Sequence, residues 1–169
     1  MKKFAFILIL GTVMLFMTSA YADVPEIHRV TQYQGVEPLF SVDITEEWNV
    51  QLKDGYITGV SDDGMLWFFL GELEEKTFDS ATEEIKDDME EILTDIIVTR
   101  TTVEFNLNGM VATSFEGTAK ENGKNVIFFT VLFKLETDEI GVLMFIADPA
   151  AEQLHLNDIM NMALSISRR

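Results

Sequence analysis

The sequence contains no cysteine, so neither a disulfide nor a lipid-carrying cysteine is available to the fold. Histidine is almost as scarce, because only His28 and His155 could serve as imidazole bases. The G-x-S-x-G, phosphate-cradling glycine-loop and H-E-x-x-H motifs are also absent. Nucleophilic catalysis needs a nucleophile, a base and an orienting group in one place. The sequence therefore predicts a protein that is not an enzyme, with no cofactor and no metal site.

Positive charge is the next shortage, since 12 lysines and arginines stand against 29 aspartates and glutamates, giving a net charge of −17. Such a surface repels nucleic acid and anionic lipid, both of which bind through a positive footprint. Apolar residues make up 47% of the chain, which excludes a disordered protein despite the charge. We therefore expect a folded acidic domain that binds no nucleic acid.

Residues 1–22 have the pattern of a signal peptide. Lys2 and Lys3 precede the apolar run Phe4–Met17, and Ala20-Tyr21-Ala22 supplies an A-x-A cleavage pattern. The run is shorter than the ~20 apolar residues of a spanning helix. We predict cleavage after Ala22, export to the periplasm or the extracellular space, and no stable membrane anchor afterwards. The remaining 147 residues carry a net charge of −19, because the removed segment holds two lysines and no acid.

Residues 23–38 are predicted to form an N-terminal arm. Apolar residues recur there at every third position, which is the stripe of a short helix that is ordered only where it packs on the domain. These residues are Val24, Ile27, Val30 and Tyr33, and Gly35 and Pro38 end the segment.

The domain itself is predicted to span residues 39–169 and to open with short strands. The predicted strands are Leu39–Ile44, Trp48–Leu52, Tyr56–Val60 and Met65–Leu70, with a hairpin turn at Asp54-Gly55. A helix then follows, opened by the capping-box pattern from Ser80 to Glu83 and ending near Thr94 or Asp95. Its apolar stripe consists of Ala81, Ile85, Met89 and Ile92.

Four strands joined by short turns should follow the helix and run antiparallel. The first, Ile97–Leu107, is predicted to place Val103, Phe105 and Leu107 on one face, and Asn108-Gly109 and Asn122-Gly123 are hairpin turns. The last two strands lie within Lys124–Ala147 and are apolar at odd and even positions alike. Because successive side chains of a strand point to opposite faces, this hairpin is predicted to be the middle of a sheet that is covered on both sides.

A closing helix is predicted from an N-cap at Asp148 and a proline at its first position, Pro149. The residues predicted to face the sheet are Leu156, Ile159, Met162, Ala163 and Ile166, with Arg168 and Arg169 at the carboxyl end. The fold class is therefore α+β: a twisted antiparallel sheet of about seven or eight strands with helices on its faces.

The segment Phe40–Trp48, with the sequence FSVDITEEW, resembles the opening F-S-(V/I)-x-(I/L/Y)-P-x-G-W of the Mog/PsbP-like superfamily. Leu164-Ser165-Ile166 is similar to the family's closing motif, whereas Thr45 and Glu47 depart from its proline and glycine. The resemblance spans roughly Leu39–Ser167 and implies an α/β/α-type sandwich used mainly for binding. Relatives in this family include an extrinsic photosystem subunit, a regulator of a nuclear-transport GTPase and bacterial exported proteins.

The first helix is the most acidic part of the chain, with eight acidic residues and one lysine between Asp79 and Asp95. Glu83, Asp87, Glu90 and Glu91 share one face, which is either a solvated surface or a contact for a protein partner. We expect an exported, non-enzymatic binding or accessory domain that acts through protein–protein contacts and uses this face. The alternative is a periplasmic carrier or sensor of divalent cations or of a small apolar ligand.

Overall fold

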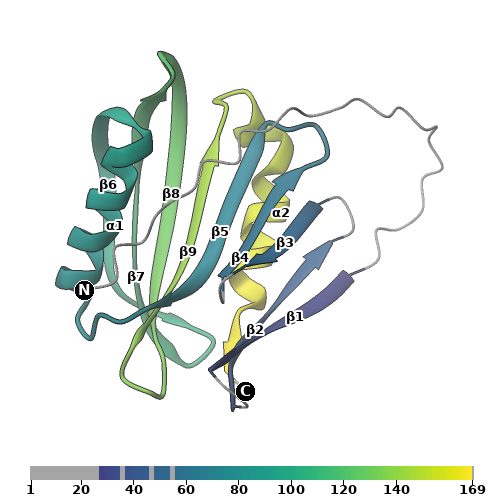
Figure 1. The fold of residues 1–169 in the computed structure, drawn as a ribbon, viewed down its shortest axis with the longest axis vertical. Coiled ribbons are helices and arrows are strands. Elements are labelled where there is room, and N and C mark those ends of the chain that lie inside the picture. Colours follow the sequence, from purple (N-terminus) through teal and green to yellow (C-terminus); the bar gives the residue numbers. More distant parts are fainter. Residues whose placement is uncertain (1–26, 35–36, 46–47, 54–55, 169) are drawn as a thin grey trace.

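The computed structural model describes residues 27–34, 37–45, 48–53 and 56–168 of the chain (Figure 1). The predicted signal peptide and its cleavage site lie outside these residues. In the described part, no helix is both long enough and apolar enough to cross a membrane. The strands are β1 (Ile27–Gln34), β2 (Glu37–Thr45), β3 (Trp48–Lys53), β4 (Tyr56–Ser61), β5 (Leu66–Leu73), β6 (Thr94–Leu107), β7 (Met110–Glu121), β8 (Lys124–Lys134), β9 (Ile140–Ala147) and β10 (Ser167–Arg168). The helices are α1 (Phe78–Ile92) and α2 (Ala151–Ser165).

Most strands form one antiparallel sheet of seven, in the order β3-β4-β5-β9-β8-β7-β6 (Figure 1). A second sheet has the order β1-β2-β10. The predicted central hairpin is confirmed, because β9 and β8 occupy the middle of the large sheet. The α+β class is also confirmed, but the strands divide into two sheets rather than one.

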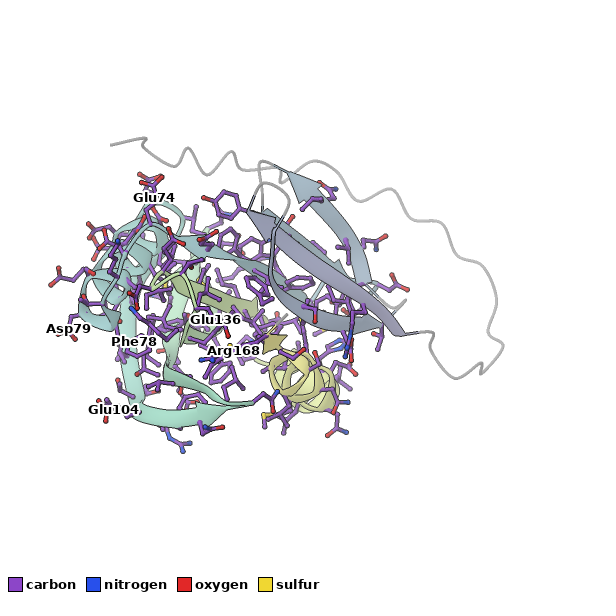
Figure 2. All side chains as sticks on the ribbon, turned by 90° about the horizontal axis from the view of Figure 1, so that it is seen from below. Glu74, Phe78, Asp79, Glu104, Glu136 and Arg168 are labelled. Atoms are coloured by element: carbon purple, nitrogen blue, oxygen red, sulfur yellow. The ribbon has the colours of Figure 1, made fainter. Side chains whose placement is uncertain are left out.

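The two faces of the large sheet bury separate apolar cores. On β8, Phe128 and Leu132 pack in the core that includes the α1 stripe, whereas Val131 and Phe133 pack in the core that includes α2 and β2. The two cores thus receive alternate residues of one strand, as strand geometry requires. The molecule has three layers: α1, the large sheet, and α2 together with the small sheet (Figure 2).

Both predicted asparagine–glycine turns of the long meander are present. Asn108 and Gly109 have φ values of 50° and 88°, and Asn122 and Gly123 have values of 49° and 80°. Positive φ at both central residues is what tight hairpin turns that match the strand twist require. The registers of β6 with β7 and of β7 with β8 are therefore set locally.

Helix α1 begins three residues earlier than a cap at Ser80 predicts. Its N-cap is Thr77, whose hydroxyl oxygen accepts a hydrogen bond from the Ser80 amide at 3.2 Å. The helix ends at Ile92, so Thr94 and Asp95 belong to β6 instead of the last helical turn. The predicted stripe is confirmed, because Ala81, Ile85 and Met89 are buried and Ile92 packs at the edge of the same core.

Helix α2 begins two residues later than a first position at Pro149 predicts. Asp148 is not its N-cap: the Asp148 carboxylate and carbonyl accept the amides of Ala150 and Ala151, both at 2.8 Å, and so form a turn before the helix. Arg168 lies in β10 beside β2 and not at the helix end. Four of the predicted inward residues, Ile159, Met162, Ala163 and Ile166, are buried, but Leu156 is 50% exposed.

The helical stripe predicted for the arm is wrong over Ile27–Gln34, because this segment is the strand β1 paired antiparallel with β2. The three-residue spacing could not reveal the pairing, since it depends on a partner strand and not on the segment itself. Arg29 reinforces the pair through two hydrogen bonds to Asp43, at 2.6 and 2.9 Å. The predicted orientation of Val103 is also wrong, because its side chain is 69% exposed instead of facing inward with Phe105 and Leu107. A register shift between Thr102 and Phe105 moves Val103 to the solvent side.

Gly117 of β7 leaves no room for a side chain beside the backbone of β6. A Cβ atom at this position would overlap the carbonyl oxygen of Ile97 and the ring of Phe128. We expect Gly117→Ala to lower the free energy of unfolding by about 2 kcal/mol, because strand backbone cannot move aside as a flexible side chain can. Urea denaturation measures the loss. The neighbouring exposed Thr118→Ala is the control and should change stability by less than about 0.5 kcal/mol, and an equal loss in both variants would contradict this reading.

Candidate functional site

The outer face of α1 carries the predicted contact residues. Because Ala81, Ile85 and Met89 face the sheet, the positions on the opposite side of the helix point to solvent. Glu83, Asp87, Glu90 and Glu91 are all exposed. Within the described residues, none of these four forms an ion pair or a side-chain hydrogen bond. The structure therefore brings the four together as one free acidic surface, which we call the α1 acidic face.

A second group of carboxylates lies where α1 meets the sheet. Partial burial raises the pKa of Glu84 and raises that of Asp88 to about 6, and neighbouring acids add to both shifts. Tyr56 of β4 lies beside this group and stacks on Phe69 with ring centroids 5.1 Å apart. Burial, reinforced by the negative charge of Glu84, raises the pKa of Tyr56 to about 12. The rim of α1 is thus a place where negative charge is crowded and partly desolvated.

Glu72 of β5 extends this crowding to the β8–β9 turn. Burial raises the pKa of Glu72 to about 8, and a hydrogen bond and charge repulsion from Glu139 contribute. The Glu72 carboxyl group therefore retains its proton at neutral pH, beside Glu139. Lys134 fixes the same turn, because its Nζ donates to the carbonyl oxygens of Lys76 and Asp138 at 2.7 and 2.5 Å. Among the described residues, no group of three His, Cys, Asp or Glu is arranged for a metal ion.

His155 joins α2 to the β4–β5 turn. Its Nε2 lies 2.8 Å from the Asp63 carboxylate and its Nδ1 lies 3.3 Å from that of Asp158. Burial alone would lower the pKa of His155, but the two carboxylates outweigh it and raise the pKa. Ser61 donates its hydroxyl to Asp63 at 2.6 Å and not to His155, so the order of groups is not that of a nucleophile, base and acid triad. The arrangement ties a turn to a helix.

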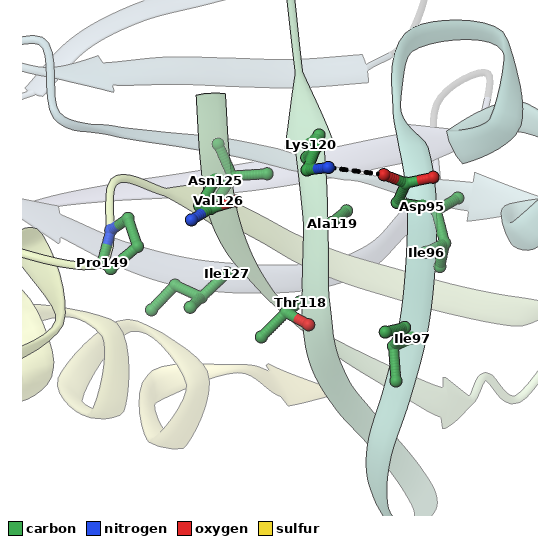
Figure 3. Close-up of a pocket in the computed structure, with 10 residues that line it drawn as sticks. All are labelled: Asp95, Ile96, Ile97, Thr118, Ala119, Lys120, Asn125, Val126, Ile127 and Pro149. Atoms are coloured by element: carbon green, nitrogen blue, oxygen red, sulfur yellow. Dashed lines mark hydrogen bonds and ion pairs between the residues drawn. The ribbon is translucent and has the colours of Figure 1, made fainter. Parts of the chain in front are cut away.

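A groove with a volume of about 700 Å³ crosses the end of the sheet farthest from β3 (Figure 3). Its lining residues are Asp95, Ile96, Ile97, Thr118, Ala119, Lys120, Asn125, Val126, Ile127 and Pro149. The Lys120 ammonium and the Asp95 carboxylate form an ion pair of 2.7 Å across its rim (Figure 3). Sequence reasoning missed this groove because its residues come from three strands and from the turn before α2. No local pattern marks them as neighbours.

Comparison with known proteins finds no matching family model and no matching curated protein. Solved structures do match. The cyanobacterial PsbP, CyanoP, from Synechocystis sp. PCC 6803 is 7% identical with a TM-score of 0.62, and the match covers 90% of this chain and 98% of CyanoP. LpqN of Mycobacterium tuberculosis, described as involved in cell envelope biogenesis, is 11% identical with a TM-score of 0.55, over 86% of this chain and 91% of LpqN. The Saccharomyces cerevisiae Ran-binding protein Mog1p is 12% identical with a TM-score of 0.53, over 85% of this chain and 96% of Mog1p.

These matches define the class of fold. The chain has the Mog/PsbP-like α+β fold, as its opening motif predicted. At such low identities the likeness concerns the arrangement of helices and strands alone, because one fold supports many functions. The functional residues are therefore inferred from the surfaces of this chain and not from its fold neighbours.

The Glu72–Glu139 pair gives stability an unusual dependence on pH. The ordinary pKa of Glu72 is 4.5 and its folded value is about 8, so between these pH values the folded protein holds a proton that the unfolded chain has released. Stability from this group is therefore complete below pH 4.5 and is lost as the pH rises through 8.

We expect Glu72→Gln to be stabilising at pH 8.5 relative to the unmodified protein and close to neutral at pH 4.5. Glu72 is only partly buried, so solvent screens it, and we expect the difference to be about 1 kcal/mol, or about 3 °C in Tm. Thermal unfolding at the two pH values measures it. The exposed Glu83→Gln is the control, and a Glu72→Gln effect that does not depend on pH would contradict the raised pKa of Glu72.

Proposed function

We propose that this protein is an exported, non-enzymatic accessory domain that binds a protein partner through the α1 acidic face. The observation that carries the proposal is that four exposed carboxylates on one helix face have no cationic partner among the described residues. By contrast, most of the exposed cations elsewhere are matched: Arg29, Arg100, Lys120 and Arg168 each pair with an acid. Helix α1 thus carries four unpaired carboxylates on a single face.

Two fold neighbours agree with this proposal without establishing it. Mog1p is described as Ran-binding, which provides a protein that binds another protein on this fold. LpqN is described as involved in cell envelope biogenesis, which agrees with the export that residues 1–22 predict. Neither similarity identifies a partner for this chain.

The chemistry of the α1 acidic face specifies the partner's charge. Only Lys86 interrupts the negative surface, so a fitting partner presents lysines and arginines. The net charge of −19 left after removal of residues 1–22 would steer such a partner towards the domain and raise its association rate. Because exposed charges are screened by salt, the contact should weaken as ionic strength rises.

The proposal is tested by reversing charge on α1. Residues 23–169 serve as bait for an envelope fraction of the source cell, and retained proteins are identified by mass spectrometry at low and moderate salt. We expect the combined variant Glu83→Lys, Asp87→Lys and Glu90→Lys to lose the salt-sensitive partner, because it turns attraction into repulsion. The Tm should stay within about 2 °C, since all three side chains are exposed.

A variant with the same change in net charge elsewhere is the control. Glu104→Lys, Glu121→Lys and Glu136→Lys together alter charge on β6, on β7 and in the β8–β9 turn, and this variant should retain the partner. Loss of capture in both variants would mean that net charge alone is responsible. If both variants retained the partner, the α1 acidic face would not be part of the contact.

The groove supports a second candidate function, a carrier of a small apolar ligand. Its volume of about 700 Å³ lies within the ~300–1,000 Å³ typical of ligand pockets. Ile97, Ile127 and Pro149 offer apolar surface, while Lys120 lies at the rim where an anionic head group would sit. A medium-length fatty acid has this combination of an apolar body and one negative charge.

Dodecanoate is the probe for this candidate. A ligand that binds only the folded protein stabilises it by about 2.7 kcal/mol at 100 times its Kd, so the Tm should rise with dodecanoate concentration. Ile97→Glu should abolish the rise by placing a charge in the groove, whereas Val103→Glu, exposed on the same strand outside the groove, should keep it. Equal responses from both variants would exclude the groove. Calcium chloride titrated in parallel tests the divalent-cation alternative.

A further inference from the structure

The outer surface of α2 is unusual for a helix of this acidic protein. Its exposed side chains, where the structure describes them, are Leu154, Leu156, Asn157, Met160, Asn161 and Leu164, and none is charged. Among these, Leu154 is 67% exposed, Leu156 50%, Met160 44% and Leu164 57%. A surface helix of a soluble protein normally directs charged and polar residues outward.

Helix α1 shows what an ordinary outer surface looks like in the same chain. It has the same length of 15 residues, and all its exposed side chains are charged: Asp79, Glu83, Lys86, Asp87, Glu90 and Glu91. The two helices cover opposite faces of the large sheet, so the described exposed side chains are charged on the helix of one face and uncharged on the helix of the other. Exposed apolar surface on an otherwise polar protein typically marks an interaction site.

We propose that α2 docks against α2 of a second copy of this chain, antiparallel and related by a twofold axis through Met160. Leu156, Met160 and Leu164 are spaced four residues apart and form one ridge along the helix. The ridge reads the same in both directions, with leucine, methionine and leucine. In an antiparallel pair, Met160 meets its counterpart and Leu156 meets Leu164 of the second copy, so the surface is self-complementary, as a twofold interface requires.

Of the two helices, α2 is the one on which a second copy can dock with less charge repulsion. Two strongly negative molecules approach at least cost where few charges face each other, and the exposed side chains described on α2 are uncharged. The α1 acidic faces then lie on the far sides of the two sheets, pointing outward and free for other contacts. Because salt screens the remaining repulsion between copies, the dimer should tighten as salt rises. The proposed α1 contact should respond in the opposite direction, so the two proposals can fail independently.

The small size of the Leu156–Met160–Leu164 ridge limits the expected affinity of the dimer. Leu156 and Leu164 are eight residues apart, which is ~12 Å of helix. Three side chains over this length cover less than the ~800 Å² that each partner buries in a standard interface. The dimer should therefore be weak and depend on concentration, forming at micromolar concentrations and above.

Single-cysteine cross-linking tests the arrangement, and the chain's lack of cysteine makes it clean. Met160→Cys should form a disulfide-linked dimer on mild oxidation at least about tenfold faster than Leu52→Cys, a matched control that is 72% exposed on edge strand β3. An equimolar mixture of Leu156→Cys and Leu164→Cys should cross-link faster than either variant alone, because only the mixture brings the two positions together. Equal rates for Met160→Cys and Leu52→Cys would overturn the proposal.

Sedimentation of the cysteine-free chain provides an independent measurement. Over ~10 μM to 1 mM protein at two salt concentrations, we expect a monomer–dimer equilibrium whose Kd rises by about 100-fold in Met160→Glu and stays unchanged in Leu52→Glu. If Met160→Glu lowers the Tm and so destabilises the fold, Leu164→Glu replaces it as the test variant, with the same expected rise in Kd. A chain that remains monomeric throughout would refute self-docking, as would α2-dependent binding to phosphatidylcholine vesicles or to another protein without self-association.

Discussion

The burial of both faces of β9 is the constraint on which the rest of the fold depends. All eight residues from Ile140 to Ala147 are buried, so apolar layers must cover the strand on each side. With no cysteine available for a disulfide, these two cores must stabilise the domain. Both apolar faces of the β8–β9 hairpin are removed from water only when it lies at the centre of a sheet with a helix on each face. The short strands and turns around it extend the sheet until its edges reach solvent.

The two covering helices meet the same internal requirement with different exteriors. Each presents an apolar stripe inward, from Ala81 to Met89 on α1 and from Ile159 to Ala163 on α2. Nothing in the packing fixes the outer residues, so their chemistry reports on what each surface meets. The charged side chains of α1 suit the proposed basic partner and repel other copies of the chain, whereas the exposed side chains described on α2 are uncharged and suit the proposed self-docking. Both proposed contacts therefore depend on residues that the packing of the fold does not constrain.

Local signals were enough to predict most strands, both asparagine–glycine turns and the inward stripe of α1, because each depends on the order of nearby residues. Features set by distant segments were not predictable in this way. Strand β1 forms through pairing with β2, Val103 is turned outward by a register shift against β7, and the groove is assembled from three strands and a turn. The acidic face of α1 was predictable because its residues lie on the side of the helix opposite the predicted apolar stripe. The interaction of His155 with Asp63, 92 residues away, had no local signal.

Protonation and the proposed contact on α1 are connected through shared electrostatics. Glu84 and Asp88 lie on the same helix as the α1 acidic face, and their raised pKa values reflect burial and crowded negative charge. A cationic partner docked on this helix would relieve that crowding and favour the ionised carboxylates. By thermodynamic linkage, binding would then release protons, and a rise in pH would strengthen binding by the same amount. The repulsion between these carboxylates destabilises the free domain, and its relief would therefore contribute to the binding free energy of a basic partner.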